Sequence, residues 1–340
     1  MINIAVIGSG DWGKNLIRNF SQLENARLKT VCDTDEKRLQ HVRSSYPGVS
    51  TTAKLAEVLD DKDINAVVIA SPAIMHYQMV EAALRKGKHT YVEKPFTLKS
   101  GEAQKLVDLA REKKLVLMVG HLLKYHPAVT YLKNLIDSGG IGEVYYLYSQ
   151  RLNLGKVRAD ENAMWSFAPH DLAVINYLLG ETPVSVSARG EAYLQKDIAD
   201  VVFMTLGFKS KKIAHVHLSW LDPHKVRRLT IVGSKKMVVF DDTEATDKIK
   251  IYDKGASKET NYETYGEYIS LRFGDIVIPH LKLTEPLNVL CKHFIDCIAK
   301  NKTPLTDGQD GLEVVKILEA AQQSLDQDGV PVRPVRDSVS

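Results

Sequence analysis

A lysine at the end of a predicted strand is the first candidate for chemistry in this sequence. Lys94 follows the strand-forming residues Tyr91 and Val92 and precedes Pro95, whose ring removes a backbone donor and disfavours helix at Lys94. In open α/β sheets, ligands bind beyond the carboxyl ends of the strands. A lysine held there can hydrogen-bond a hydroxyl oxygen and stabilise developing negative charge. The alternative is a surface lysine before a turn.

The amino terminus carries the residues of a dinucleotide-phosphate site. The apolar run from Ile2 to Ile7 leads into Gly8-Ser9-Gly10-Asp11-Trp12-Gly13 and then a helical pattern. Gly8 permits a tight turn, Gly10 lets the backbone approach a pyrophosphate, and Gly13 lets the helix pack close to the strand. The flanking strand and helix make this motif specific for a dinucleotide.

Asp33 stands where the acid that binds the adenosine ribose belongs, twenty positions after Gly13. Its carboxylate can accept both ribose hydroxyls and would repel a 2′-phosphate, which favours NAD over NADP. Lys37 and Arg38 lie close enough to leave NADP open, and Asp33 or Asp35 could instead cap a helix.

The elements that must position these residues alternate between strand and helix through residue 122. After Lys94 we expect a helix from Ser100 to Lys113 and a strand from Leu115 to Val119. Ser71-Pro72 ends an earlier strand, and His76 opens the next helix at the same sheet edge. This alternation predicts a doubly wound α/β Rossmann domain over residues 1–122, and His76 either lines the nicotinamide side of its site or is structural.

The remainder, residues 123–340, predicts an α+β domain for substrate binding and oligomerisation. Short polar turns separate the predicted strands, which implies a large, mostly antiparallel open sheet. We expect helices over His121–Asp137, Pro169–Leu179, Leu287–Ala299 and Gln309–Ser324 and a long loop over Asp253–Ser270. The predicted strands are Val144–Leu152, Val184–Glu191, Asp200–Gly207, Ile213–Leu218, Arg227–Val232 and Met237–Phe240.

Composition excludes several classes of protein. The chain has 340 residues, 44% hydrophobic and 26% charged, with a formal net charge of +3, so we expect no nucleic-acid partner. No apolar run approaches the length of a membrane span, and Met1 leads directly into a strand, which predicts a cytoplasmic protein without a membrane partner. Three cysteines suit a reducing compartment. We expect no metal at Cys291-x-His293 or at His215-x-His217.

These motifs together resemble the Gfo/Idh/MocA oxidoreductases. The resemblance rests on the glycine motif, on Val68-Ile69-Ala70-Ser71-Pro72 with His76, on Glu93-Lys94-Pro95, and on a histidine motif opening a helix in a β-sheet domain. It implies that Lys94 and His170 flank the reacting carbinol, with His170 as base, although a histidine after Pro169 could also simply begin a helix. It implies cofactor contacts from Gly8, Ser9, Gly10, Asp11, Trp12, Gly13, Asp33, Ser71, Pro72, His76, Glu93 and Lys94.

The second half resembles a branch of this family from bacterial surface-polysaccharide gene clusters, whose members oxidise nucleotide-linked amino sugars, often at C3. The segment from Gly155 to Leu172 and the run from Ser219 to Arg227 carry this likeness. In the family as a whole an aspartate usually precedes the catalytic histidine by four residues, and this chain has Ser166 there, which puts the acid/base pairing in doubt. Lys225 is a further candidate for the substrate phosphates. The implied substrate-binding residues are Lys94, Tyr125, Arg151, Asn153, Arg158, Ser166, His170 and Arg227.

Two other functions fit the same residues. Some relatives use bound NAD to oxidise a sugar transiently, eliminate a glycoside and reduce again, so an NAD-dependent glycoside hydrolase is one alternative. A non-catalytic protein that binds NAD or a sugar is the other, although it would need neither Lys94 nor His170. An exposed sheet face predicts a homodimer or homotetramer.

Overall fold

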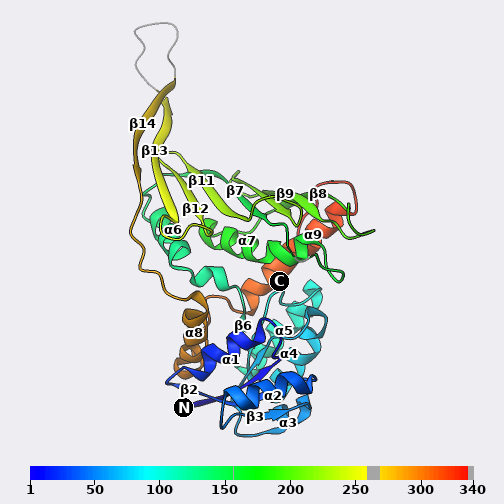
Figure 1. Cartoon of the computed structure of the whole chain (residues 1–340). Helices are drawn as coiled ribbons and strands as arrows, with labels where there is room; N and C mark the ends of the chain where they lie inside the picture. The colour runs from blue at the N-terminus through cyan, green and yellow to red at the C-terminus, as the bar shows by residue number, and fades with distance from the viewer. Residues whose placement is uncertain (156, 259–268, 336–340) are drawn as a thin grey trace. The chain divides into compact units, whose positions relative to one another are not determined.

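The structure is a computed structural model that describes residues 1–155, 157–258 and 269–335 (Figure 1). Contacts divide the chain into two compact units, each assembled from two segments. The first unit contains Met1–Tyr125 and Thr284–Lys316, and the second contains His126–Leu283 and Ile317–Ser340. The boundary expected after residue 122 lies close to the first division, but the expectation assigned Thr284–Lys316 to the second domain.

A six-stranded parallel sheet forms the centre of the first unit, with the order β3-β2-β1-β4-β5-β6. Its central strands are apolar runs buried on both faces, as expected for strands covered by helices on either side. The strands are Ile2–Ile7 (β1), Ala26–Cys32 (β2), Ser50–Thr52 (β3), Ala66–Ile69 (β4), His89–Val92 (β5) and Leu117–Val119 (β6). The helices are Gly13–Ser21 (α1), Glu36–Ser45 (α2), Leu55–Asp60 (α3), His76–Arg85 (α4) and Ser100–Lys113 (α5), with a short 3-10 turn at Ala73–Met75 (η1). The expected Rossmann fold is confirmed.

Helix α8, Pro286–Lys300, belongs to the first unit because its apolar face completes that unit's core. Leu290 and Phe294 are fully buried in the same cluster as the β1 residue Ile4. The Phe294 ring lies edge-on to Phe20 of α1 and to Tyr91 of β5, with centroid distances of 6.4 and 6.0 Å. The helix was predicted correctly, but its partners are more than 190 positions away in the sequence.

The helix expected over His121–Asp137 is interrupted. The structure has a 3-10 turn at Leu122–Tyr125 (η2) and then α6 at Pro127–Asp137. His126 has an extended backbone and its Nδ1 accepts from the amide of Ala128, so it caps α6. Pro127 explains the break, because the residue before a proline avoids the helical region.

An eight-stranded sheet forms the second unit, with the order β14-β13-β12-β11-β7-β10-β9-β8. Only β7 and β10 pair in parallel, so the expected mostly antiparallel sheet is confirmed. The strands are Val144–Leu152 (β7), Ser185–Glu191 (β8), Val201–Gly207 (β9), Ile213–Ser219 (β10), Val226–Gly233 (β11), Met237–Asp241 (β12), Ile249–Lys258 (β13) and Ile269–Val277 (β14).

Helix α7, Ala163–Leu179, covers one face of this sheet and contacts β7, β9 and β10 (Figure 1). It begins six residues before the expected start at Pro169, which therefore lies inside the helix. Asn162 explains the earlier start, because its side chain accepts from the amide of Trp165 and caps the first turn. Pro169 has no amide hydrogen to donate to the carbonyl of Trp165, which removes one helical bond.

The expected loop at Asp253–Ser270 is wrong where the structure describes it. Residues 253–258 continue β13 and residues 269–270 begin β14, which together form an antiparallel pair at the edge of the sheet (Figure 1). Residues 259–268 lie outside the described part. Cross-strand pairing, which leaves no local pattern in this polar segment, explains the strands.

Helix α9, Gly308–Leu325, is shared between the two units: its residues up to Lys316 belong to the first and those from Ile317 to the second. Within the described ranges, no helix combines the length and apolar character needed to cross a membrane.

Candidate functional site

The glycine loop has the geometry of a phosphate-binding turn. Gly8 has φ +95°, and a Cβ there would lie 2.6 Å from the carbonyl oxygen of Ala70, so only glycine fits. Gly13 touches the Gly8 carbonyl closely enough to exclude a side chain. At Gly10 a Cβ would meet only the Arg38 guanidinium, at 3.5 Å. No side chain caps the start of α1, so its amides suit a pyrophosphate.

Asp33 lies at the carboxyl end of β2, beside this loop. Its Oδ2 accepts from the Ser9 amide at 2.6 Å and the Ser9 hydroxyl at 2.8 Å, and its Oδ1 accepts from the Asp35 amide. Burial alone would raise the pKa of Asp33, but these hydrogen bonds and the Arg38 charge outweigh it and lower the pKa. Asp33 is therefore ionised at neutral pH, with the Arg38 guanidinium 3.7 Å away.

A pocket of about 280 Å³ borders Ser9 and is lined by Lys14, Lys37 and Arg38 from α1 and α2. These cations lie at the end of the site where the adenosine ribose of a dinucleotide binds in Rossmann folds. Asp33 and the cations act oppositely on a 2′-phosphate, so the choice between NAD and NADP stays a prediction.

His76 is buried, and both ring nitrogens are close to carbonyl oxygens. Nδ1 lies 2.8 Å from the oxygen of Pro95 and Nε2 lies 3.0 Å from that of Ser71. Burial lowers the pKa of His76 despite these contacts. The ring therefore connects the segment after β4 with the segment after β5. Pro72, which directly follows Ser71, is exposed. Contact between His76 and the cofactor stays a prediction.

Glu93 is a second buried carboxyl group at this edge. Its Oε1 accepts from the Trp12 indole and from the Tyr91 hydroxyl, each at 2.6 Å, and its Oε2 accepts from the Lys94 amide at 3.3 Å. Burial raises the pKa of Glu93, and these donors together with the Lys94 charge oppose the rise. The connection to Trp12 was not foreseen, since the two residues lie 81 positions apart.

Lys94 is half-buried directly after β5. Its charge contributes to lowering the pKa of both His76 and His121, after burial as the main cause. The first-unit residues proposed for the cofactor therefore lie at the carboxyl ends of β1, β2, β4 and β5. The structure brings them to one edge of one sheet, where ligands of such sheets bind.

A buried polar cluster that the sequence did not reveal adjoins this edge. His121 follows β6, and Lys124 donates to Asp310 at 2.7 Å. His121 Nδ1 and Asp310 Oδ2 are 3.8 Å apart, and neither has a hydrogen-bond partner among the described residues. Burial, with help from Lys124 and Lys94, lowers the pKa of His121 to about 3. The histidine is therefore neutral at physiological pH.

Tyr125 lies within the core of the first unit. Its side chain is 6% exposed, and its hydroxyl group lies 3.1 Å from Thr306 Oγ1. Burial raises the pKa of Tyr125, which makes it a poor proton donor or acceptor at neutral pH. Its predicted role in substrate binding has no support from this environment.

In the second unit, Ser166 and His170 lie one turn apart on α7, hence on the same side of the helix. Ser166 is buried and His170 is half-buried. The helix around them is apolar on nearly all sides, and Asn162 fixes its first turn. His170 is therefore held on a rigid element, as a proton-transfer group requires.

Arg151 is committed to an ion pair beside His170. From β7, its Nε donates to Asp171 Oδ2 at 2.6 Å and its Nη2 to Oδ1 at 3.3 Å, while Ser149 also donates to Asp171. Both partners are nearly buried. The predicted role of Arg151 as a phosphate ligand therefore competes with its role in holding α7 against the sheet.

Asn153 and Arg227 lie at the same end of β7, and Arg158 lies beside the connection between β8 and β9, where its carbonyl accepts from Gln195. The Asn153 amide donates to the carbonyl of Ser219 at 3.1 Å, and Arg227 lies opposite Arg151 on β11. Arg158 and Arg227 are exposed and pair loosely with Glu161 at 3.0 Å and Asp242 at 3.6 Å. Such surface pairs contribute little to stability, so both guanidinium groups can turn to an anionic ligand.

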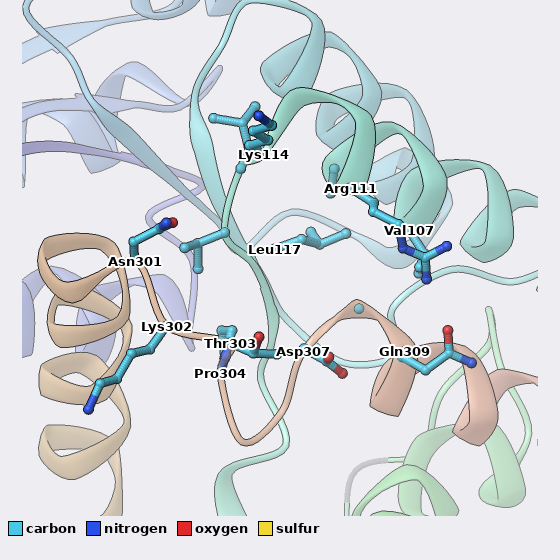
Figure 2. A pocket seen from close by; sticks show the side chains of 14 residues that line it. Val107, Arg111, Lys114, Leu117, Asn301, Lys302, Thr303, Pro304, Asp307 and Gln309 are labelled. Atoms are coloured by element: carbon cyan, nitrogen blue, oxygen red, sulfur yellow. The ribbon is translucent and has the colours of Figure 1, made fainter.

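A second pocket of the first unit, with a volume of about 320 Å³, is a separate feature (Figure 2). The pocket is lined by Arg111 and Lys114 from the end of α5 and by Lys302 and Asp307, which follow α8 (Figure 2). Two helix carboxyl ends meet there, and cations at helix carboxyl ends offset the helix dipole. The positive charges have a structural reason, so we assign this pocket no ligand.

Segments of both units match known protein families. Residues 2–121 match the family described as "Oxidoreductase family, NAD-binding Rossmann fold", and residues 129–239 match "GFO/IDH/MocA C-terminal domain". The UDP-N-acetylglucosamine 3-dehydrogenase of Acidithiobacillus ferrooxidans is 32% identical over 317 residues, which are 91% of this chain and 93% of that one. A solved structure of that enzyme has a TM-score of 0.81, with 26% identity over 96% and 98% of the two chains.

Two further relatives have other activities. The scyllo-inositol 2-dehydrogenase (NAD(+)) of Bacillus subtilis is 25% identical over 350 residues, covering 98% and 96% of the chains. The 2,7-anhydro-N-acetylneuraminate hydratase of Escherichia coli is 25% identical over 371 residues, covering 96% of each. Similar chains therefore differ in substrate and in reaction.

Proposed function

Because the chain belongs to the Gfo/Idh/MocA family of NAD-binding oxidoreductases, we propose that it oxidises a nucleotide-linked amino sugar at the C3 hydroxyl group. The observation that carries this proposal is the 32% identity, along nearly the full length, to an enzyme named for that reaction. The reaction would serve the biosynthesis of surface polysaccharides in the cytoplasm.

Each catalytic role follows from the chemistry of one group. When bound, NAD supplies the hydride acceptor, and the residues of the first unit that would hold it are the glycine loop and Asp33. His170 would take the proton of the sugar hydroxyl, and Lys94 would stabilise the negative charge that develops on that oxygen. Ser166 carries no charge, so it cannot share the proton of His170 as the aspartate usual at this place could.

The exposed cations of the second unit support a phosphate-bearing substrate. Arg158 and Arg227 have guanidinium groups that suit the diphosphate of a nucleotide sugar, and Lys225 lies on the same segment as Arg227. A free cyclitol or monosaccharide would have no use for these charges. Removing Arg227 should therefore weaken binding of a nucleotide sugar and leave oxidation of an uncharged sugar unchanged.

A panel of substrates tests the proposal. The purified protein would be incubated with NAD or NADP and each of several UDP-linked amino sugars, UDP-glucose and inositols, and NADH formation would be followed by absorbance. We expect oxidation of a UDP-N-acetyl amino sugar, and loss of the product ketone when the 3-hydroxyl is absent. Turnover of inositols alone would contradict the nucleotide-sugar assignment.

Transient oxidation is the second candidate, because a hydratase matches the chain over the same length as the dehydrogenases. An enzyme of that kind converts its substrate without net formation of NADH. Product analysis by mass spectrometry, with catalytic NAD, would detect this reaction in the same panel. Binding of a sugar with neither outcome would instead indicate a non-catalytic NAD or sugar-binding protein.

We also propose that the protein is a homodimer or homotetramer. The sheet face opposite α7 carries exposed apolar side chains, including Tyr146, Phe203 and Ile213, which are 45–52% exposed. Contiguous apolar surfaces of this kind often mark contacts between subunits. Light scattering of the purified protein gives its mass in solution and tests this directly.

A further inference from the structure

The Glu93 carboxylate connects two segments that serve different parts of the proposed site. Trp12, in the glycine loop, donates its indole hydrogen to Oε1, and the Lys94 backbone amide contacts Oε2. In the sheet, β4 separates β1, which leads into the glycine loop, from β5, which ends at Glu93. The Trp12–Glu93 hydrogen bond therefore spans the end of an intervening strand.

Trp12 occupies the position where a restraint would affect a pyrophosphate. It is the N-cap residue of α1, it has no side-chain capping bond, and it directly precedes Gly13. The amides that would meet a phosphate belong to this turn. Trp12 is 41% exposed, so packing alone does not immobilise its indole, which is held by the 2.6 Å hydrogen bond to Glu93.

The surroundings of Glu93 leave no freedom for the carboxylate to move. A Cβ on Gly120 would lie 2.9 Å from Glu93 Oε2 and 2.5 Å from the Tyr91 hydroxyl. Tyr91, itself 1% exposed, donates to the same oxygen as Trp12. The buried Tyr91 hydroxyl group therefore holds the Glu93 carboxylate in place, and the carboxylate in turn holds the partly exposed indole ring of Trp12.

We propose that Glu93 is a positioning residue that sets the affinity for NAD through Trp12, by holding the N-cap of α1 in the conformation that binds the pyrophosphate. This deepens the proposed function and rests on NAD binding by the first unit. It assigns Glu93 a role without direct contact to the cofactor. It also gives different roles to the two hydrogen bonds that Glu93 Oε1 accepts. The hydrogen bond from Trp12 affects the affinity for the cofactor, and the one from Tyr91 affects the stability of the core.

NADH titration of variants tests this without any sugar substrate. Glu93→Gln keeps the shape of the side chain and should weaken NADH binding by roughly 5–20-fold, since a charge-assisted hydrogen bond is lost. Trp12→Phe should weaken it similarly. If Glu93 acts through Trp12, adding Glu93→Gln to Trp12→Phe should change the dissociation constant by less than about twofold.

Tyr91→Phe is the matched control, because it removes the other donor to the same oxygen. We expect it to lower the melting temperature and to change NADH affinity by less than about twofold, since the indole contact remains. Trp12→Phe should do the reverse, because Trp12 is partly exposed and contributes little to the core. Acrylamide quenching, taken as the difference between each protein and its Trp12→Phe counterpart, should show a more accessible indole in Glu93→Gln.

The inference would be overturned if Glu93→Gln reduced NADH affinity by the same factor in the wild-type protein and in Trp12→Phe. Unchanged NADH affinity in Trp12→Phe would overturn it as well, even if Glu93→Gln does not fold. If Glu93→Gln and Trp12→Phe show the expected non-additive effect on NADH affinity but the protein oxidises no sugar, only the substrate assignment is refuted. A wild-type protein that binds no NADH would refute both.

Discussion

Arg151 Nε lies 2.6 Å from Asp171 Oδ2, and Asp171 directly follows His170 in α7. The ion pair joins the sheet to the helix that carries the proposed base, and both side chains are nearly buried, at 11% and 8% exposure. A buried carboxylate that loses its partner is strongly destabilising, because its charge remains without compensation. This pair therefore gives a test of what supports His170.

We expect Arg151→Leu to lower the free energy of unfolding by about 3 kcal/mol, because Asp171 would stay buried and unpaired. The double variant Arg151→Leu with Asp171→Leu should recover much of this loss. Urea unfolding measures both effects, and Arg189→Leu, at an exposed position of β8, provides a control that should be nearly neutral. A single variant as stable as the wild type would show that the pair does not hold α7.

The Asp33 carboxylate should make NAD the preferred cofactor. Its charge opposes a 2′-phosphate, and we expect catalytic efficiency with NAD to exceed that with NADP by on the order of 10–100-fold. Asp33→Ser should reduce or invert this ratio, since Lys37 and Arg38 already line the pocket. Arg38→Gln in the Asp33→Ser background should remove the gain with NADP. Equal efficiencies in the wild type would contradict the prediction.

Lys94→Met should lower kcat by roughly 10²-fold or more while NADH affinity changes little, because the lysine contact strengthens as negative charge develops on the substrate oxygen. Steady-state kinetics with the sugar identified by the panel, together with NADH titration, separate the two effects. Lys99→Met changes an exposed lysine five positions later and should be neutral. Near-normal turnover in Lys94→Met would return Lys94 to an ordinary surface role.

His170→Ala should lower turnover by roughly 10²–10⁴-fold, as expected for the loss of a general base. The rise of rate with pH that deprotonation of the base produces should disappear. Ser166→Asp, which supplies the aspartate usual in the family, should shift that rise to higher pH and keep or increase activity, because a nearby negative charge stabilises the protonated imidazole. If His170→Ala keeps its activity and Ser166→Asp changes nothing, another group moves the proton. The next candidates, Tyr125 and His126, are both buried, and burial raises the pKa of Tyr125 and lowers that of His126.

His121 should make the protein sensitive to acid. Its pKa is about 3 in the folded state and about 6.5 when unfolded, so between these values the unfolded state binds the additional proton. Stability should therefore rise with pH across this window and fall as the pH drops below about 6.5. His121→Gln should reduce the slope of stability against pH by an amount that corresponds to at most about one bound proton. Melting temperatures measured from pH 7 to pH 4 test this. An unchanged slope would mean that His121 is already protonated when folded.

The sequence alone determined the fold class and the cofactor half of the site, because both depend on neighbouring residues. Buried parallel strands are continuous apolar runs, and the glycine loop requires a strand, small residues and a helix in immediate succession. Helix α5 and strand β7 have the predicted bounds. The same short segment contains Gly8 and Gly13, the two positions where any side chain would collide with the backbone.

Tertiary structure decided whatever depends on partners that are distant in sequence. Helix α8 joins the first unit because Phe294 fits between Phe20 and Tyr91, and β14 is a strand because it pairs with β13. Arg151, a predicted phosphate ligand, is also paired with Asp171, and Pro169, the predicted start of a helix, lies inside α7 because Asn162 caps an earlier first turn. Trp12 and Glu93 carry no mark of each other in the sequence. Their hydrogen bond exists because parallel strands bring their carboxyl ends to one edge, and only the order of the strands determines which ends become neighbours.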